Sequence, residues 1–327
     1  MSEAQKNGGA KVVPLLSRMR LDGVIRGKVK KPIRVTVYGG SGVGKTTFGA
    51  NAPKPIFLGA EDGTAQLDVA RFPKPETFEE VLEAVRILST EQHDFQTLVI
   101  DSLDWIEPLI WRKVCQSDGV ELIEHVGGGY GKGYTAAIDD WRMLFAALER
   151  LQAAKGVHVV LIAHGHIKTF KNPETAGDYD RYQLKLNERA SGLVKEWSDA
   201  LLFARHEVLV HKDGKHKSAR ARGVETGARI LCTNERAAFD AKNRYSLPDT
   251  LPLSWPDFEA AVRAGQPSDP GALKSEIERK AKQLGGDIER LALETLEKCG
   301  DSPANLAVLN NRLNAKLTEM VQQSEEN

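Results

Sequence analysis

Residues 39–46 read Gly-Gly-Ser-Gly-Val-Gly-Lys-Thr and follow directly on the apolar stretch 33–39. This run matches the pattern GxxxxGK[ST], whose glycines let the backbone curl so that successive N–H groups face an anion. The lysine adds a point charge, the threonine hydroxyl is a ligand for Mg²⁺, and the start of the following helix favours a phosphate. We therefore expect a nucleoside triphosphate and Mg²⁺ to bind here, held by Gly39, Gly40, Ser41, Gly42, Val43, Gly44, Lys45, Thr46 and Thr47.

A second apolar strand ends in a carboxylate. Residues 97–102 read Thr-Leu-Val-Ile-Asp-Ser, a run typical of a buried strand, and Asp101 stands at its end. Because a carboxylate at this place commonly holds Mg²⁺ beside a phosphate loop, we assign the metal site to Thr46 and Asp101. Asp104 is a rival for Asp101, but it lies past the strand end, where it is also placed to cap a helix.

Apolar strands and amphipathic helices alternate along most of the chain. Such alternation is typical of a parallel sheet covered on both faces, and the Asp-Gly pair at 213–214 indicates a β-hairpin. We therefore predict an α/β fold with a mostly parallel central sheet, flanking helices, antiparallel edge hairpins and a small helical C-terminal part. The predicted strands are 33–39, 56–60, 97–102 and 158–164, and the predicted helices are 77–90, 105–115 and 136–154.

Composition divides the chain into three parts. Residues 1–31 form a flexible basic arm, residues 32–265 form the α/β core, and residues 266–327 form a linker and a helical segment. The linker is the stretch Ala-Gly-Gln-Pro-Ser-Asp-Pro-Gly, and apolar residues at helical spacing follow it.

Charge and composition exclude several classes of protein. The 327 residues carry 45 basic and 45 acidic side chains, unlike a protein that is basic over its whole surface. Residues 11–34 nevertheless hold eight basic residues and one acid, and residues 211–223 hold five basic residues and one acid. These stretches are either solvated faces or sites for a polyanion. No apolar run reaches the roughly 20 residues that span a bilayer, and the three cysteines form no CxxC pair, so we expect no membrane contact and a cytoplasmic location.

Two further polar residues follow predicted strands at one edge of the sheet. Glu61 comes after the strand 56–60, and His164 ends the strand 158–164. Because the carboxyl ends of parallel strands face the ligand crevice, Glu61 is the candidate base for hydrolysis and His164 the candidate contact for the γ-phosphate. The alternatives are an exposed loop acid and a half-buried histidine. A zinc site from His164 and His166 has no further ligands at a suitable spacing.

This set of residues resembles the RecA-like ATPases rather than the AAA+ or GTPase branches. The resemblance lies in the stretches FLGAED, LVIDS and LIAHGH, which end three successive predicted strands. It implies an enzyme that hydrolyses ATP with Mg²⁺, in which Glu61 is the catalytic glutamate, Asp101 the metal ligand and His164 the γ-phosphate sensor. Glutamine is the more familiar sensor residue. From about Pro32 to Ala264 the layout is most similar to phage core-only RecA-like proteins of the Sak-type annealing group, which carry an AAA-type ATPase domain.

The resemblance also implies contacts with DNA. The family's two DNA-binding loops fall on residues 125–137 and 165–191, which read as loops on composition. Cationic side chains in such loops meet phosphates, and aromatic rings stack on bases of a single strand. The candidate residues are Tyr130, Lys132, Lys168, Phe170, Lys171, Arg181 and Lys185.

A Lys-x-Arg pair in the family's position implies an oligomer. RecA-like filaments and hexameric helicases place such a pair against the γ-phosphate of the neighbouring subunit, and Lys242 and Arg244 match it. The resemblance thus implies a homo-oligomer, a ring or a filament, with ATP at subunit interfaces. The alternative is a pair of surface cations.

Three functions fit these features. The first is a single-stranded-DNA-dependent ATPase that promotes annealing or strand exchange. The second is a ring-forming helicase or DNA-packaging motor on the same core. The third is a nucleotide-gated adaptor or loader, whose C-terminal helices bind a partner such as a single-strand-binding protein.

Overall fold

The computed structural model describes residues 31–59, 66–171, 177–212, 221–265 and 270–300, with a few residues nearer the two ends. For some of these residues only the backbone is described. Contacts divide the chain into two compact units, residues 1–30 and 31–327. Glu61 and most of the predicted basic arm lie outside the described residues. None of the described helices has both the length and the apolar character to cross a membrane.

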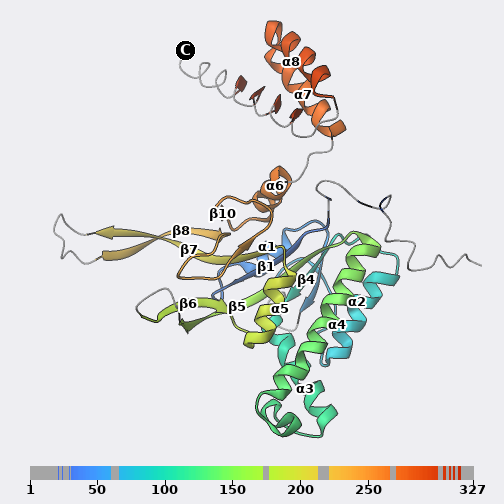
Figure 1. Cartoon of the computed structure of the whole chain (residues 1–327), viewed down its shortest axis with the longest axis vertical. Helices are drawn as coiled ribbons and strands as arrows, with labels where there is room; N and C mark the ends of the chain where they lie inside the picture. Colours follow the sequence, from blue (N-terminus) through green and yellow to red (C-terminus); the bar gives the residue numbers. More distant parts are fainter. Residues whose placement is uncertain are drawn as a thin grey trace, which may run out of the picture. The chain divides into compact units, whose positions relative to one another are not determined.

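One ten-stranded sheet forms the centre of the second unit (Figure 1). Its main path is β10-β8-β7-β1-β5-β4-β2-β3, while β6 pairs with β5 and β9 with β7. The six strands from β7 to β3 pair in parallel, and the pairs made by β8, β10, β6 and β9 are antiparallel, which confirms the predicted fold class. The strands are β1 (Arg34–Gly39), β2 (Pro55–Gly59), β3 (Ala70–Arg71), β4 (Thr97–Asp101), β5 (His158–Phe170), β6 (Tyr179–Leu184), β7 (Ala200–Lys212), β8 (Ala221–Cys232), β9 (Lys242–Asn243) and β10 (Thr250–Pro252).

Helices cover both faces of the sheet. Side chains of a strand alternate between the faces, and in β4 Leu98 and Ile100 enter one hydrophobic cluster while Val99 enters the other. This double burial explains why the parallel strands are almost continuously apolar. The helices are α1 (Lys45–Ala50), α2 (Phe78–Thr90), α3 (Leu103–Asp118), the 3₁₀ segment η4 (Ile123–Gly128), α4 (Lys132–Lys155), α5 (Glu188–Trp197), α6 (Trp255–Gly265), α7 (Pro270–Leu284) and α8 (Gly286–Cys299).

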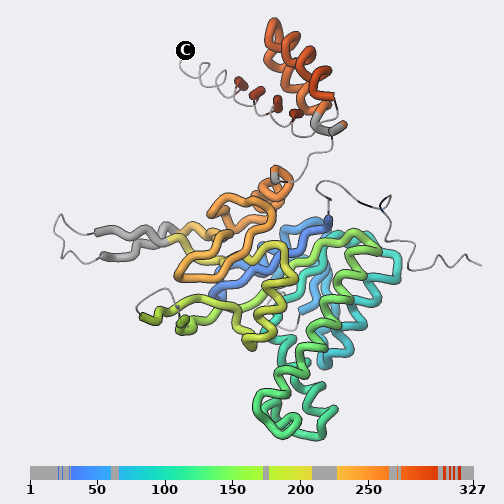
Figure 2. The backbone as a smooth tube through the Cα atoms, viewed as in Figure 1, coloured from blue at the N-terminus to red at the C-terminus, as the bar shows by residue number. Residues whose placement is uncertain are grey.

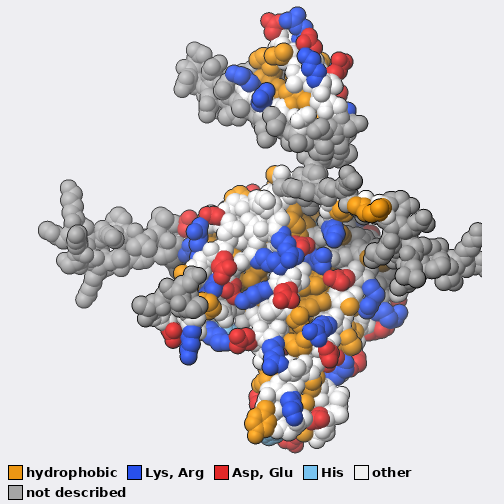
Figure 3. All heavy atoms as spheres, viewed as in Figure 1, with side chains coloured by type: hydrophobic (Ala, Val, Ile, Leu, Met, Phe, Trp, Pro, Cys, Tyr) orange, Lys and Arg blue, Asp and Glu red, His pale blue; other side chains and the backbone are white. Residues whose placement is uncertain are grey.

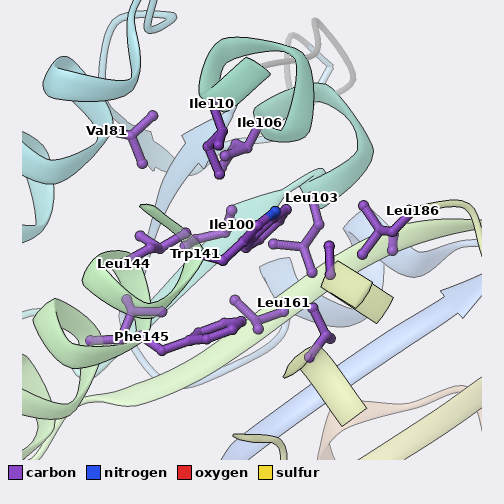
Figure 4. Packing of buried hydrophobic residues seen from close by; sticks show 14 of the residues in the cluster. Val81, Ile100, Leu103, Ile106, Ile110, Trp141, Leu144, Phe145, Leu161 and Leu186 are labelled. Carbon is purple, nitrogen blue, oxygen red and sulfur yellow. The ribbon is translucent and has the colours of Figure 1, made fainter. Parts of the chain in front are cut away.

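The larger cluster fills the face covered by α2, α3, α4 and α5. Trp141 of α4 is fully buried, and Figure 4 shows it between Leu144 of its own helix and Ile100 and Leu161 of the sheet. The smaller cluster lies on the opposite face, where Phe48 of α1 contacts the rings of Trp255 and Phe258 of α6. The phosphate loop thus begins a helix that is packed on both the sheet and α6.

Two segments predicted as loops have regular structure, and these predictions were wrong. Strand β5 continues past His164 to Phe170 and pairs with β6 to form an antiparallel hairpin, which can be followed in Figure 2. The hairpin tip, residues 172–176, lies outside the described residues. Residues 125–137 form the end of η4, a tight glycine turn and the first turn of α4.

The C-terminal helices have a cluster of their own. Ile277 and Ala281 of α7 pack with Ala292 and Leu296 of α8 and with the described leucines after residue 304. The predicted helical segment is therefore helical where the structure describes it, and its apolar spacing is that of a small bundle.

Candidate functional site

The phosphate loop joins β1 to α1. Gly42 and Gly44 have φ values of 74° and 106°, a region that side chains strongly disfavour. Gly39 has no room for a side chain, since an added Cβ would lie 2.1 Å from the carbonyl oxygen of Ala204. Lys45 is buried, and its Nζ donates hydrogen bonds to the carbonyl oxygens of Gly39, at 3.2 Å, and Gly40, at 2.8 Å. The lysine is thus held over the loop by the loop's own backbone.

Thr46 and Asp101 are brought together as the sequence predicts. The Thr46 hydroxyl donates a hydrogen bond of 2.7 Å to Oδ2 of Asp101, which is buried at the carboxyl end of β4. Neighbouring ligands of an octahedral Mg²⁺ at about 2.1 Å lie roughly 3 Å apart, so this hydroxyl and carboxylate fit the ion. No group of three or more His, Cys, Asp or Glu side chains among the described residues is placed to hold a metal, so phosphate and water oxygens would complete the coordination.

A pocket of about 280 Å³ opens over the loop. Parallel pairing of β1 with its two neighbours determines which residues flank the pocket. Gly39 lies opposite His164 on β5 and opposite Ala204 on β7. Strand β5 lies between β1 and β4 and so places His164 between the phosphate loop and Asp101. The lining residues are Ser41, Gly42, Gly44, Lys45, Thr46, Thr47, Asp101, His164 and Arg229.

The His164 ring is fixed by Asp104. The backbone N–H of His164 donates to Oδ1 of Asp104 at 2.9 Å, and Nδ1 lies 2.8 Å from Oδ2. Burial raises the pKa of Asp104, but the hydrogen bonds from the backbone and ring of His164 outweigh it and hold the pKa below its usual value. When Nδ1 of the ring donates to Asp104, the other ring nitrogen, Nε2, points away from Asp104. Asp104 is therefore a site residue whose role sequence spacing did not reveal.

Glu107 lies one turn further along α3 and is almost fully buried. Its two carboxylate oxygens accept from the backbone N–H of Asn187 at 3.0 and 3.1 Å. Asn187 is the N-cap of α5, which follows the hairpin β5–β6. Burial raises the pKa of Glu107 to about 7, with a further rise from the charge of Asp104.

Lys242 and Arg244 lie at the opposite end of the sheet from the phosphate loop. Lys242 pairs with Leu201 near the amino end of β7, whereas Gly39, where the phosphate loop begins, lies opposite Ala204 further along β7. Its Nζ donates to the carbonyl oxygens of Lys195, Glu196 and Ser198 at 2.6, 3.0 and 2.7 Å, so it caps the C-terminal end of α5. A contact with a neighbour's nucleotide would require the ammonium to leave these three acceptors. Arg244 is exposed and lies 3.3 Å from Asp199, an ion pair that solvent weakens.

Arg181, a predicted DNA contact, has partners within the chain. Its side chain is 5% exposed, it pairs with Glu235 and, at 2.8 Å, with Asp240, and it lies over the ring of Phe170. Arg181 therefore ties β6 to the segment between β8 and β9, whereas Phe170 contacts Arg181 and Tyr179 within the hairpin itself. These contacts occupy the Arg181 side chain, and its contact with DNA stays a prediction.

The remaining predicted DNA contacts are exposed. Tyr130 is 99% exposed, while Lys132 donates to the carbonyl oxygen of Gly127 at 2.8 Å. Lys168 lies 3.4 Å from Glu188, and Lys171 and Lys185 are also exposed. Burial lowers the pKa of His166, and the charges of Lys168 and Lys185 lower it further, which shows that these cations gather on one part of the hairpin. Elsewhere on the face drawn in Figure 3, acidic and basic side chains intermingle.

Of the comparisons with known proteins, the match to a family model includes the phosphate-binding loop. No curated protein matches the sequence. Solved structures that match include the RadB recombinase, at 15% sequence identity and a TM-score of 0.31, with 62% of this chain and 89% of that chain covered. A family model described as an AAA domain matches residues 31–245, which include the loop, Asp101, His164 and the Lys-x-Arg pair. The chain therefore belongs to the AAA domain family.

Proposed function

We propose that the protein is a RecA-like ATPase whose nucleotide state controls its binding of single-stranded DNA, for annealing or strand exchange, as in the Sak-type proteins of phages. The observation that carries the ATPase part is the convergence of Lys45, Thr46, Asp101 and His164 on one pocket. An AAA-family domain with these groups has the components that phosphoryl transfer needs, a cation, a metal site and a γ-phosphate contact.

Each residue has a defined task in the proposed reaction. Lys45 exchanges its two carbonyl acceptors for phosphate oxygens, and Thr46 and Asp101 hold the metal. Mg²⁺, when bound, neutralises charge on the phosphates. Asp104 orients His164 toward the γ-phosphate. Glu61, which lies outside the described residues, is proposed to orient the attacking water.

The hairpin β5–β6 supports the DNA part of the proposal. It starts at the pocket, since the backbone N–H of Lys185 donates to the carbonyl oxygen of His164 at 2.9 Å. It also presents two cations, Lys168 and Lys185, near His166, whose pKa their charges lower. A contact between His164 and the γ-phosphate would thus act directly on the base of a basic hairpin.

ATPase assays with and without long single-stranded DNA test the proposal. The wild-type rate should rise on addition of DNA, and Lys45→Ala should abolish hydrolysis because no other lysine lines the pocket among the described residues. Wild-type turnover that DNA leaves unchanged would contradict the DNA part, and intact turnover in Lys45→Ala would contradict the site.

Charge reversal tests whether DNA binding depends on the lysines of the hairpin rather than on exposed lysines elsewhere. Lys168→Glu with Lys171→Glu should weaken binding of single-stranded DNA at least tenfold, with a smaller salt dependence, because phosphate contacts dominate such binding. The matched control is Lys282→Glu with Lys298→Glu on α7 and α8, where exposed lysines are also lost. Equal DNA affinity in both double variants would remove the hairpin from the proposal.

A nucleotide-gated adaptor is the second candidate. Ile288, Leu291 and Leu293 of α8 are exposed, and Ile288 and Leu291 line a pocket of about 310 Å³. Exposed apolar side chains of this kind are typical of protein contacts. An adaptor predicts slow turnover that DNA does not change and retention of a protein partner that Leu291→Glu abolishes.

A further inference from the structure

Arg229 is the one residue of the pocket wall that no motif of the sequence includes. It lies on β8, whereas the other lining residues belong to the phosphate loop, β4 and β5. In the sheet, β4 and β5 lie on one side of β1, and β7 and β8 lie on the other, as Figure 1 shows. Arg229 therefore approaches the loop from the side opposite Asp101 and His164.

The guanidinium lies directly against the loop. A Cβ added to Gly44 would be 3.0 Å from Nη1 of Arg229 and 3.4 Å from Cδ2 of Leu253. The backbone N–H of Leu253 donates to the carbonyl oxygen of Arg229 at 2.9 Å, and Arg229 pairs with His206 of β7. Residues paired across antiparallel strands share a face, so His206 and Arg229 lie on one face of the sheet, and Arg229 and Leu253 form a row beside Gly44 of the phosphate loop.

The chemistry of this row suits a nucleotide. Arg229 is exposed, and no ion pair joins it to a carboxylate in the part of the chain that the structure describes. A guanidinium presents a planar fork of donors that binds phosphate oxygens and stacks on flat rings. The loop lysine reaches the β- and γ-phosphates, so the end of the nucleotide away from Asp101 and His164 is the α-phosphate and the nucleoside.

We propose that Arg229 binds the α-phosphate end of the nucleotide in its own subunit. This inference rests on the proposed function, because it presupposes that the pocket takes a nucleoside triphosphate. It differs from the role proposed for Arg244, which would serve a neighbouring subunit. A contact at the α-phosphate holds ATP and ADP alike and does not detect the γ-phosphate.

Binding of fluorescent ADP and ATP analogues to the full-length protein without DNA tests this inference. Arg229→Gln should raise both dissociation constants about tenfold, the loss of one charge-assisted hydrogen bond, while the ratio between them stays as in the wild type. In steady-state hydrolysis the effect should fall on KM rather than on kcat. Arg229→Lys keeps the charge and should recover part of the affinity, and Arg290→Gln, an exposed arginine on α8, should bind as the wild type.

Other outcomes overturn the inference. Wild-type affinity in Arg229→Gln removes Arg229 from the site, and a selective loss of ATP over ADP moves it to the γ-phosphate. Thermal unfolding of the nucleotide-free variants shows whether each is folded, and Arg229→Lys provides the test if Arg229→Gln is not. Failure of the proposed function looks different, because wild-type protein would then bind neither nucleotide, or would bind both without a response to DNA.

Discussion

Asp104 and Glu107 lie one helical turn apart on α3, and their pKa values move in opposite directions. Both carboxylates are buried, which raises the pKa of each. Asp104 receives two hydrogen bonds from His164, and these favour its charged form. Among the described residues, Glu107 accepts the backbone N–H of Asn187, and it lies near the charge of Asp104. Burial therefore dominates the pKa of Glu107, whereas the hydrogen bonds from His164 dominate that of Asp104.

The raised pKa of Glu107 predicts a pH dependence of stability. Glu107 is protonated in the folded protein up to about pH 7, whereas an unfolded chain releases this proton near pH 4.5. Folding therefore takes up a proton between these values, and stability falls as pH rises through this window, by about 3 kcal/mol in all. Glu107→Gln stays neutral, so urea unfolding should show the variant equal to wild type at pH 4.5 and more stable at pH 8. The exposed Glu297→Gln is the control, and parallel pH profiles of wild type and Glu107→Gln would contradict the prediction.

Asp104→Asn should disturb sensing of the γ-phosphate. The amide still accepts the backbone N–H of His164 but no longer fixes the ring, so kcat should fall roughly ten- to hundredfold, the value of a charge-assisted hydrogen bond. The preference for ATP over ADP in binding should fall as well, while ADP affinity stays unchanged. A merely structural role would instead lower both affinities. Asp139→Asn, exposed on α4, should behave as the wild type.

The residues that sequence reasoning identified are those with a fixed local pattern. The phosphate loop and Asp101 follow from glycines, a lysine and a strand end that stand close together in the chain. Asp104 contacts His164, 60 residues further along the chain, and Arg229 lies against Gly44, from which about 185 residues separate it, so no local pattern indicates either residue. In the sequence, Asp104 also resembled an ordinary residue that caps the start of a helix.

At the scale of elements, helices were easier to predict than the hairpin. Helix α2 begins with a capping box, in which Thr77 and Glu80 satisfy each other's backbone N–H groups, and its apolar residues keep helical spacing. The hairpin β5–β6 has polar side chains on both faces, and its anchor is the buried Arg181. A buried arginine whose two carboxylate partners are distant in sequence produces no periodic pattern of apolar residues. The sequence of residues 165–191 therefore indicated a loop.

Arg181→Ala should therefore destabilise the fold. Removal of one partner from a buried ion pair leaves an uncompensated charge, here on Asp240, which costs about 3–5 kcal/mol; Lys195, also paired with Asp240, reduces this loss. Chemical denaturation should show a loss of about 3 kcal/mol. Lys185→Ala, an exposed cation of the same hairpin, should change stability by less than about 0.5 kcal/mol. Equal stabilities would show that Arg181 is not the anchor.

At the scale of the whole molecule, the position of the Lys-x-Arg pair bears on whether the protein acts as an oligomer. Neither Lys242 nor Arg244 is at the end of the sheet that carries the phosphate loop, so they cannot serve the nucleotide of their own subunit from there. The division into arm, core and C-terminal segment, and the oligomer itself, remain predictions.

Mixing two inactive variants tests whether Arg244 acts in a neighbouring subunit. Lys45→Ala and Arg244→Ala should each lose hydrolysis. In a random 1:1 mixture about a quarter of the interfaces join an intact loop to an intact arginine, so a comparable fraction of activity should return. A mixture as inactive as its components, while both still assemble by light scattering, would show that Arg244 has no such role.

Strand β5 is both a wall of the pocket and one side of the hairpin, and this continuity has a mechanical consequence. From His164 to Phe170 the strand extends roughly 20 Å, and its ladder with β6 begins at Gly165. If the two paired strands rotate together about His164, they act as one rigid arm of this length. Rotation by about 5° there would carry the far end roughly 2 Å, half the spacing between neighbouring strands. A small motion at His164 would thus be magnified at Phe170.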